Sequence, residues 1–257
     1  MMKKTQISAQ LYCFREFIKT PAGVVDTLKR LRDIGYQSVQ LTSALPAELQ
    51  SAELSAILAE SGMKAISSHE PSSDFFNAPD KVIAKLKALN ITHTAYPWPH
   101  IPPTGIGEAV AFAHKLNELA LKFKEQGITL AYHNHATEFK KLQGKLMLEL
   151  IYENAPDLAA EIDTFWVHKG GGDPVAWIKR TAGRMEYLHI KDYGIDFHSG
   201  NPVMAPIGSG NLNWHEIIST AETCGVKYFI VEHDGDVLDP FESFETSFNY
   251  LKKNFME

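Results

Sequence analysis

The feature that most constrains the fold is a repeated pattern, in which a short apolar stretch is followed by an amphipathic segment, eight times along 257 residues. The stretches expected to be strands are 6–14, 36–41, 64–68, 91–96, 128–133, 158–163, 185–191 and 227–232. Apolar residues at three- and four-residue spacing predict helices over 21–34, 46–60, 79–89, 107–126, 146–154, 174–181, 214–223 and 241–252. Gly35, Gly62 and Gly127 follow three of these segments, as is typical of helix ends.

No change of composition, charge run or low-complexity linker separates the eight units. They therefore predict one closed (β/α)8 TIM barrel, an α/β fold that forms a single domain over residues 1–257. An open, doubly wound sheet is the alternative. It is less favoured because the first strand lacks the glycine-rich loop of dinucleotide-binding sheets.

Charge and hydropathy exclude several classes of partner. The formal net charge is −6, and the lysines and arginines are scattered, so no nucleic-acid partner is expected. No segment approaches the roughly 20 apolar residues that span a bilayer, so no membrane partner is expected either. The first residues lack a continuous apolar signal core, which predicts a cytoplasmic protein, although a removed leader remains open.

Polar residues gather at the ends of the predicted strands. The chemistry of a TIM barrel takes place at the carboxyl ends of its strands, so residues there are candidates for function. The candidates are His69, His133, His135, Asp163, His189, Lys191, Glu232, His233 and Asp234. The other histidines, such as His93, His100, His114, His198 and His215, are expected on helices or loops at the surface.

One set, His133, Asp163, His189 and Glu232, takes a ligand-type residue from each of four successive strands. Two imidazoles and two carboxylates that point toward one position suit a divalent ion: manganese, zinc, cobalt, iron or magnesium. The alternative is a buried ion-pair network without a metal, in which Asp163 pairs with Lys191 and Glu232 with a histidine. Burying several ionisable groups is costly, so either arrangement points to a functional site.

Several short strings follow one another in an order that resembles the xylose-isomerase-like TIM-barrel superfamily, in the branch of sugar phosphate isomerases/epimerases. The strings are Gln10-Leu11-Tyr12, Ile34-Gly35-Tyr36, Ser68-His69, Tyr132-His133-Asn134-His135 with Glu138-Phe139, Asp163 with Trp166, Gly171-Gly172-Asp173-Pro174, Leu188-His189-Ile190-Lys191-Asp192, Ile207-Gly208-Ser209-Gly210 and Val231-Glu232. Together they cover nearly the whole chain and are specific for the fold and branch, but not for a substrate.

The resemblance implies a divalent-metal site at the barrel mouth. Ketose epimerases of this superfamily use Glu, Asp, His and Glu there, and the last three correspond to Asp163, His189 and Glu232. The first corresponds to His133, so only one glutamate remains of the pair that exchanges protons in those enzymes. Trp166 stands where those epimerases carry a histidine shortly after the aspartate.

These features predict an isomerase or epimerase that acts on a small sugar or sugar derivative, at a carbon next to a carbonyl, through an enediolate-type intermediate. Glu232 is expected to be a ligand and the base, with His135 and Lys191 as acid or oxyanion partners. The expected substrate contacts are Tyr12, His69, Trp98, Glu138 and Trp166.

Three alternatives remain open. A metal-dependent dehydratase or lyase on a keto-sugar or cyclitol could begin with the same proton abstraction, and the single glutamate favours it. An endonuclease for abasic DNA would need a cationic face, which the net charge of −6 does not supply. The third is a non-catalytic barrel that binds a sugar or a metal. The sequence leaves open whether the protein forms a homo-oligomer.

Overall fold

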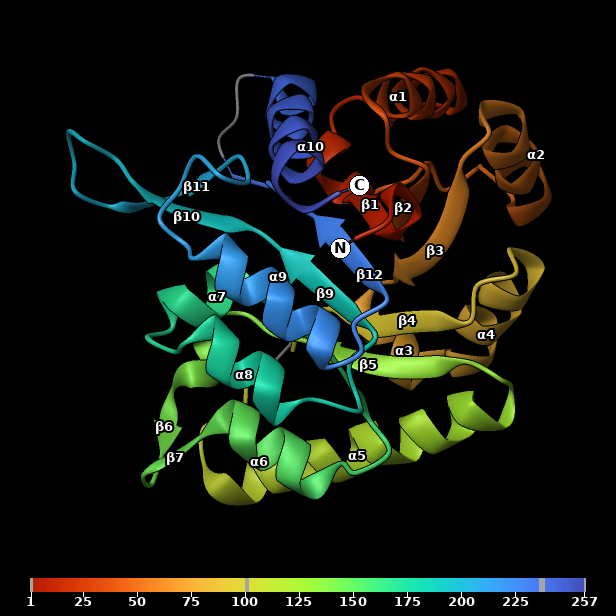
Figure 1. Cartoon of the computed structure of the whole chain (residues 1–257). Coiled ribbons are helices and arrows are strands. Elements are labelled where there is room, and N and C mark those ends of the chain that lie inside the picture. Colours follow the sequence, from red (N-terminus) through yellow and green to blue (C-terminus); the bar gives the residue numbers. More distant parts are fainter. Residues whose placement is uncertain (1, 100–101, 236–238, 257) are drawn as a thin grey trace.

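Eight parallel strands form a closed barrel in the computed structural model, which describes residues 2–99, 102–235 and 239–256 (Figure 1). The barrel strands are β1 (Ile7–Gln10), β2 (Ser38–Thr42), β3 (Lys64–His69), β4 (His93–Tyr96), β5 (Thr129–His133), β8 (Ala159–Asp163), β9 (Tyr187–Ile190) and β12 (Tyr228–Val231). Pairing of β1 with both β2 and β12 closes the barrel. The predicted (β/α)8 TIM barrel is confirmed.

Helices surround the barrel (Figure 1). They are α1 (Pro21–Ile34), α2 (Ser51–Ser61), α3 (Ser72–Asn77), α4 (Pro79–Ala88), α5 (Ile106–Glu125), α6 (Met147–Asn154), α7 (Thr164–Lys169), α8 (Pro174–Arg180), α9 (Trp214–Thr223) and α10 (Pro240–Phe255). The start of α8 is capped: the side chain of Asp173 accepts from the N–H of Val175, with Pro174 in the first turn. Among the described residues, none of the helices is both long and apolar enough to cross a membrane.

The apolar core lies between the barrel and its helices, and its packing next to α1 and α10 explains one glycine. Gly35 ends α1 with a φ of 134°, and a Cβ there would come within 2.5 Å of the Phe248 ring. Tyr36, directly after it, is fully buried and donates a hydrogen bond to the carbonyl of Phe244 at 2.9 Å. The turn after α1 therefore fits against α10 only without a side chain at position 35.

The first strand is shorter than the sequence suggests. The predicted strand over 6–14 is wrong beyond Gln10, because Leu11–Phe14 forms a 3-10 helix. The side chain of Gln10 caps this helix by accepting from the N–H of Tyr12 at 3.1 Å. The turn brings Tyr12 to the mouth of the barrel, where 41% of its surface is exposed.

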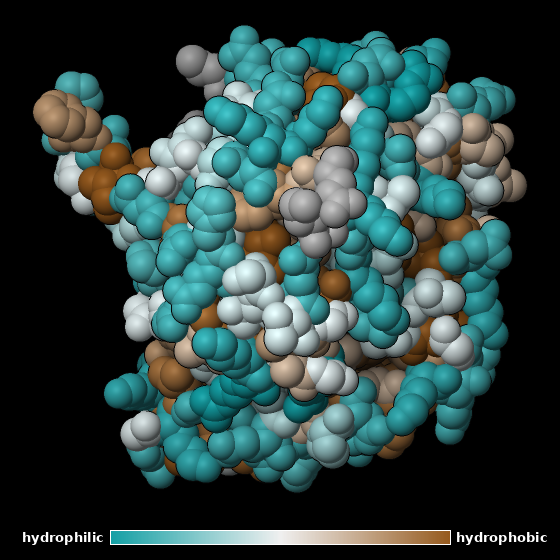
Figure 2. All heavy atoms as spheres, viewed as in Figure 1, coloured by the Kyte–Doolittle hydropathy of each residue, from teal (hydrophilic) through white to brown (hydrophobic). Residues whose placement is uncertain are grey.

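Two antiparallel hairpins are added to the barrel. One is small and joins β6 (Lys141–Leu142) to β7 (Lys145–Leu146). The other joins β10 (Asp192–Ile195) to β11 (Pro202–Ala205) and projects from the body of the molecule (Figure 1). Figure 2 shows hydrophobic residues on this projection, and Phe197 between the two strands is 93% exposed.

Asp192 fixes the base of the larger hairpin. Its carboxylate accepts from the backbone N–H groups of Gly208 and Gly210 at 2.8 and 3.0 Å, and from the indole N–H of Trp214 at 2.7 Å. A buried carboxylate with several donors is a stable anchor. The segment that returns from the hairpin to α9 is therefore held beside the end of β9.

Candidate metal centre and pocket

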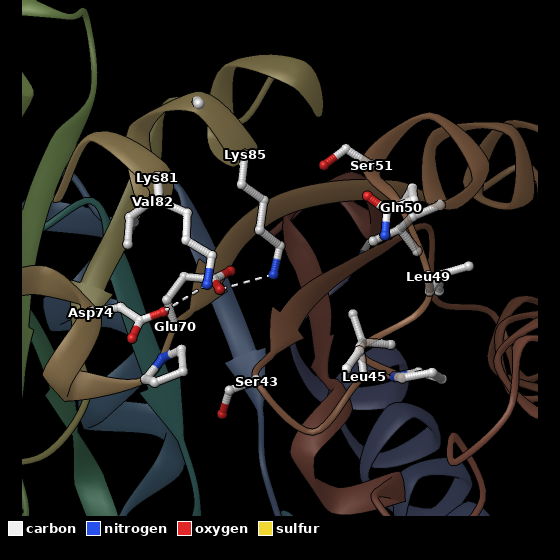
Figure 3. Close-up of a pocket in the computed structure, with 15 residues that line it drawn as sticks. Ser43, Leu45, Leu49, Gln50, Ser51, Glu70, Asp74, Lys81, Val82 and Lys85 are labelled. Atoms are coloured by element: carbon white, nitrogen blue, oxygen red, sulfur yellow. Dashed lines mark hydrogen bonds and ion pairs between the residues drawn. The ribbon is translucent and has the colours of Figure 1, made fainter. Parts of the chain in front are cut away.

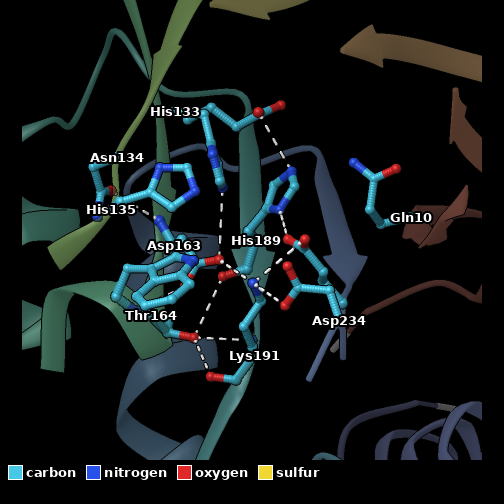
Figure 4. A network of polar contacts seen from close by, with 12 residues as sticks. Gln10, His133, Asn134, His135, Asp163, Thr164, His189, Lys191 and Asp234 are labelled. Carbon is cyan, nitrogen blue, oxygen red and sulfur yellow. Dashed lines mark hydrogen bonds and ion pairs between the residues drawn. The ribbon is translucent and has the colours of Figure 1, made fainter. Parts of the chain in front are cut away.

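The four residues expected to bind a metal lie together at the carboxyl ends of the barrel strands. His133 and Asp163 are the last residues of β5 and β8, His189 is in β9, and Glu232 directly follows β12. Each offers one ligand atom, these atoms lie within 4.8 Å of one another, and all four residues are buried. Figure 4 shows His133, Asp163 and His189 directed toward a common region.

Buried polar atoms without a hydrogen-bond partner make this cluster suitable for a cation. Both ring nitrogens of His133, Nε2 of His189 and Oδ2 of Asp163 are buried and lack a hydrogen-bond partner. His133 Nε2 and Asp163 Oδ2 lie 3.6 Å apart. Buried polar atoms without partners are rare in folded proteins, and imidazole with carboxylate is a common donor set for divalent metals. The residues present therefore fit a divalent ion.

Lys191 is fully buried beside the cluster, and it supplies the contacts of the ion-pair alternative. Its Nζ lies 3.4 Å from Asp163 Oδ2, 3.3 Å from Glu232 Oε1 and 3.0 Å from Asp234 Oδ1. Burial lowers the pKa of Lys191, but these three carboxylates outweigh burial and raise it above its ordinary value. One ammonium therefore faces three carboxylates, which leaves negative charge for a second cation.

Charges around the cluster also set the pKa values of Glu232 and His189. Burial raises the pKa of Glu232, but Lys191 and His189 outweigh it and hold the pKa well below its usual range. Burial lowers the pKa of His189, whereas the charges of Glu161 and Glu232 raise it to about 10. Glu232 Oε2 is 2.6 Å from His189 Nδ1. Glu232 is thus ionised and fixed from two sides.

Glu161 is a buried carboxylate that our sequence analysis missed. It lies in β8 two residues before Asp163, so the alternation of a strand places it on the same side and one layer deeper. Its Oε2 is 2.5 Å from His69 Nε2 and 3.3 Å from His189 Nε2. His69, Glu161 and His189 form a second group of possible ligands, which shares His189 with the first.

Amides and hydroxyls support Glu161 on the other side of the barrel. Gln40 donates to Glu161 Oε1 at 2.8 Å and to Ser67 Oγ at 3.1 Å, and Gln10 donates to the amide oxygen of Gln40. All four side chains are buried. The interior of a TIM barrel is usually filled by branched apolar residues, so this polar layer behind the site departs from the usual packing.

A cavity of about 270 Å³ lies above the cluster. The expected residues Tyr12, His69, Trp98, His133, His135 and Glu232 line it, together with Asp234. The indole of Trp98 contacts the ring of His135 at 4.4 Å, and Trp166 contacts His135 from another direction at 5.2 Å. Burial, with the positive charge of Lys191 nearby, lowers the pKa of His135 well below its usual value. His135 is therefore a neutral imidazole among aromatic rings.

The structure differs from the expectation at Glu138, Trp166 and His93. Trp166 is not among the residues that line the cavity and contacts His135 instead. Glu138 is fully buried, and it accepts hydrogen bonds from Tyr132 Oη at 2.8 Å and from the N–H of His135 at 2.9 Å, so it supports the loop instead of lining the cavity. The expectation that His93 is a surface residue is wrong, because it lies buried in β4 and stacks on Tyr187 at 3.7 Å. His100 lies outside the described residues.

Solved structures with the same fold include enzymes of more than one class. A sugar phosphate isomerase/epimerase from Parabacteroides distasonis superposes with a TM-score of 0.82 at 24% identity, covering 99% of this chain and 96% of that one. The probable 3-DHS dehydratase AsbF of Bacillus anthracis gives 0.75 at 15% identity, covering 97% and 99%. A xylose isomerase-like TIM barrel protein from Mycobacterium smegmatis in complex with magnesium gives 0.72 at 15% identity, covering 98% of each chain.

At these identities the structures show a shared fold and not a shared activity. No curated protein matches the sequence. A family profile gives the stronger assignment, because it matches residues 28–254, and so includes all four residues of the candidate metal site. The chain belongs to the xylose isomerase-like TIM barrel family.

Proposed function

We propose that the protein is a metal-dependent enzyme that moves a proton at a carbon next to a carbonyl of a sugar-like substrate, as an isomerase or epimerase. The observation that carries this proposal is the convergence of His133, Asp163, His189 and Glu232 below a cavity at the barrel mouth, with buried nitrogen and oxygen atoms that lack a hydrogen-bond partner. These four side chains would hold the ion. When bound, a divalent ion supplies Lewis-acid polarisation of a substrate carbonyl.

Glu232 is the base in this proposal. Its low pKa keeps it ionised, and it lines the cavity, so its carboxylate can accept a proton from a substrate carbon. Lys191 lies 3.3 Å from Glu232 Oε1 and carries the compensating charge. When Glu232 becomes protonated, this ammonium loses one of its partners and keeps Asp163 and Asp234.

A second acid or base is needed to return the proton on the other side of the carbon. His69 lines the same cavity, and Glu161 holds its Nε2 at 2.5 Å, an arrangement in which a carboxylate orients an imidazole. Neutral His135 lines the cavity, so its ring can contact a substrate hydroxyl. His69 with Glu161 and Glu232 with Lys191 thus form two distinct proton-transfer groups at one cavity.

Metal removal and reloading test the proposal. The protein is stripped with a chelator and reloaded with manganese, zinc, cobalt, iron or magnesium, and each form is assayed in D2O against a panel of ketoses. An isomerase or epimerase returns a product of unchanged formula with deuterium at the reacting carbon, and activity follows the metal content. Binding of sugars without turnover by any reloaded form would show a non-catalytic barrel.

A dehydratase is the second candidate. It is favoured by the single glutamate among the four ligand residues, because loss of a neighbouring group needs only one base for the carbon proton. The structural similarity to the probable 3-DHS dehydratase is consistent with it. The same assay separates the two candidates, because a dehydratase gives a product that has lost the mass of one water.

A further inference from the structure

A second cavity, of about 580 Å³, opens beside the first on the same face of the barrel. It lies between α2 and α4, and Figure 3 shows Leu45 and Leu49 on one side and Glu70, Asp74 and Lys81 on the other. The proposed reactions take place in the smaller cavity, over the four candidate metal ligands. The larger cavity has no role in them.

The two cavities meet at the ends of β2 and β3. Ser43 lines both. Thr42 lines the inner cavity and Leu45 the outer one, while His69 lines the inner cavity and Glu70 the outer one. The shared residue Ser43 places the outer cavity directly beside the inner one.

Charges in the outer cavity are already paired. Lys85 Nζ lies 2.8 Å from Glu70 Oε2, and Lys81 Nζ lies 3.5 Å from Asp74 Oδ2. Glu70 is 5% exposed and is also held by the Ser68 hydroxyl at 2.5 Å, so it is a fixed acceptor. Two lysines and two carboxylates leave no net charge to attract a phosphate or an ammonium group.

The opposite side of the outer cavity is apolar. Leu45, Leu49 and Leu54 line it, and Gln50 and Ser51 supply neutral polar groups. An uncharged ring can pack on the leucines and direct hydroxyl groups toward the polar side. The inner cavity lies below the roughly 300–1,000 Å³ of pockets for drug-sized ligands, and the outer one lies within that range.

We propose that the cavity between α2 and α4 is a subsite for the uncharged substituent of a glycoside whose sugar ring carries a ketone, since the proposed reaction needs a carbonyl in that ring. The reacting sugar ring occupies the inner cavity, and a second ring, aromatic or sugar, occupies the outer one. The inference rests on the proposed function, because it takes the inner cavity as the place of the reacting sugar. Binding energy from such a remote ring can support the reaction as well as the affinity.

Calorimetry on the metal-loaded protein tests this subsite. The probes are paired methyl and phenyl glycosides of glucose, galactose, mannose and xylose, with cellobiose and p-carboxyphenyl glucoside as further arms. We expect the phenyl member of at least one pair to bind about tenfold or more tightly than the methyl member. A similar gain in affinity for cellobiose over methyl glucoside would identify a sugar as the second ring. We expect p-carboxyphenyl glucoside, whose aryl group is charged, to bind without this gain in affinity.

Ala84→Trp supplies the structural control. Ala84 is an exposed residue of α4 that lines the outer cavity, so an indole there fills the space without disturbing the core. We expect it to bring the phenyl-to-methyl affinity ratio close to one while methyl glycosides bind as before. The matched variant is Ala56→Trp, at an exposed position of α2 that does not line the cavity, and it is expected to keep the wild-type ratio.

The subsite would be contradicted if the methyl and phenyl members of every pair bound equally well, or if no pair bound. It would also be contradicted if Ala84→Trp kept the phenyl-to-methyl affinity ratio of the wild type. These outcomes differ from failure of the proposed function. Suppose that the wild type binds phenyl glycosides more tightly than methyl glycosides, that Ala84→Trp removes this difference, and that no sugar is turned over. This result would support the subsite and contradict the reaction. Turnover of free ketoses without phenyl selectivity would support the reaction and contradict the subsite.

Discussion

The two halves of the barrel mouth are built from different side chains. The half from β1 to β4, the neutral wall, presents Gln10, Tyr12, Thr42, Ser43, His69 and Trp98 to the cavity. The half from β5 to β12, the charged wall, contains His133, Glu161, Asp163, His189, Lys191, Glu232 and Asp234. The contrast suggests that the charged wall holds the metal and the base, while the neutral wall orients the substrate and adds the second proton-transfer residue, His69. Substitutions on each wall can test this division.

The largest effect is expected from Asp163→Ala on the charged wall. It removes a proposed ligand, and we expect metal affinity to fall by at least about 100-fold, since even residues behind the ligands cost 10–100-fold, with loss of activity. Metal content after dialysis measures this. Asp163 also caps α7 by accepting from the N–H of Trp166 at 2.9 Å, so Asp163→Asn, which keeps a capping oxygen, separates ligation from folding. Metal binding as in the wild type by both variants would contradict the assignment.

Glu232→Gln is expected to lower kcat by about 10²–10⁴-fold while most of the metal stays bound, because the amide cannot accept the substrate proton. Loss of deuterium exchange into the substrate would show that the carbon proton is no longer removed. Glu125→Gln, at an exposed position near the end of α5, is the control and should leave kcat unchanged. If Glu232→Gln turned over substrate at the wild-type rate, another residue would have to be the base.

Lys191→Met should destabilise the metal-free protein by about 3–5 kcal/mol, because removing one partner of a buried ion pair leaves its carboxylates uncompensated. A bound divalent ion adds positive charge, so we expect manganese to restore much of this stability in urea unfolding. The control is Lys227→Met, which breaks an exposed pair with Glu186 and should cost about 0–1 kcal/mol. If manganese did not reduce this loss of stability, Lys191 would not be coupled to metal binding at the four candidate ligands.

Gln40→Leu, in the layer behind the neutral wall, is expected to have the smallest effect. It removes a hydrogen bond to the ionised carboxylate of Glu161 and should cost about 1–3 kcal/mol in urea unfolding, with metal content unchanged. If it released the metal as Asp163→Ala does, the division of the mouth into two walls would be wrong, and the amide layer would have to be counted with the ligands.

Sequence reasoning predicted the charged wall better than the neutral one. His133, Asp163, His189 and Glu232 stand at strand ends, where the topology of a parallel barrel brings residues together whatever the details of packing. Gln40 and Glu161 lie inside strands instead. The side chain of a polar residue inside a strand can point into the barrel or out toward the helices. Its direction is known only once the closed barrel is seen.

Residues with two roles were also hard to predict. Asp163 is both a proposed ligand and the N-cap of α7, a helix that the sequence analysis did not predict. Glu138 follows the histidine pair but supports the loop through Tyr132 and the backbone of His135. A carboxylate near a strand end can bind substrate or hold backbone N–H groups, and its partners far along the chain decide between the two.

The anchor at Asp192 has a consequence for how such a protein can diversify. Because one carboxylate holds the returning segment of the β10–β11 hairpin directly after Lys191, the hairpin can change in length or sequence while the buried ammonium keeps its position. The projection is thus an interchangeable module. A change in this hairpin is therefore expected to leave the candidate site at the barrel mouth in place.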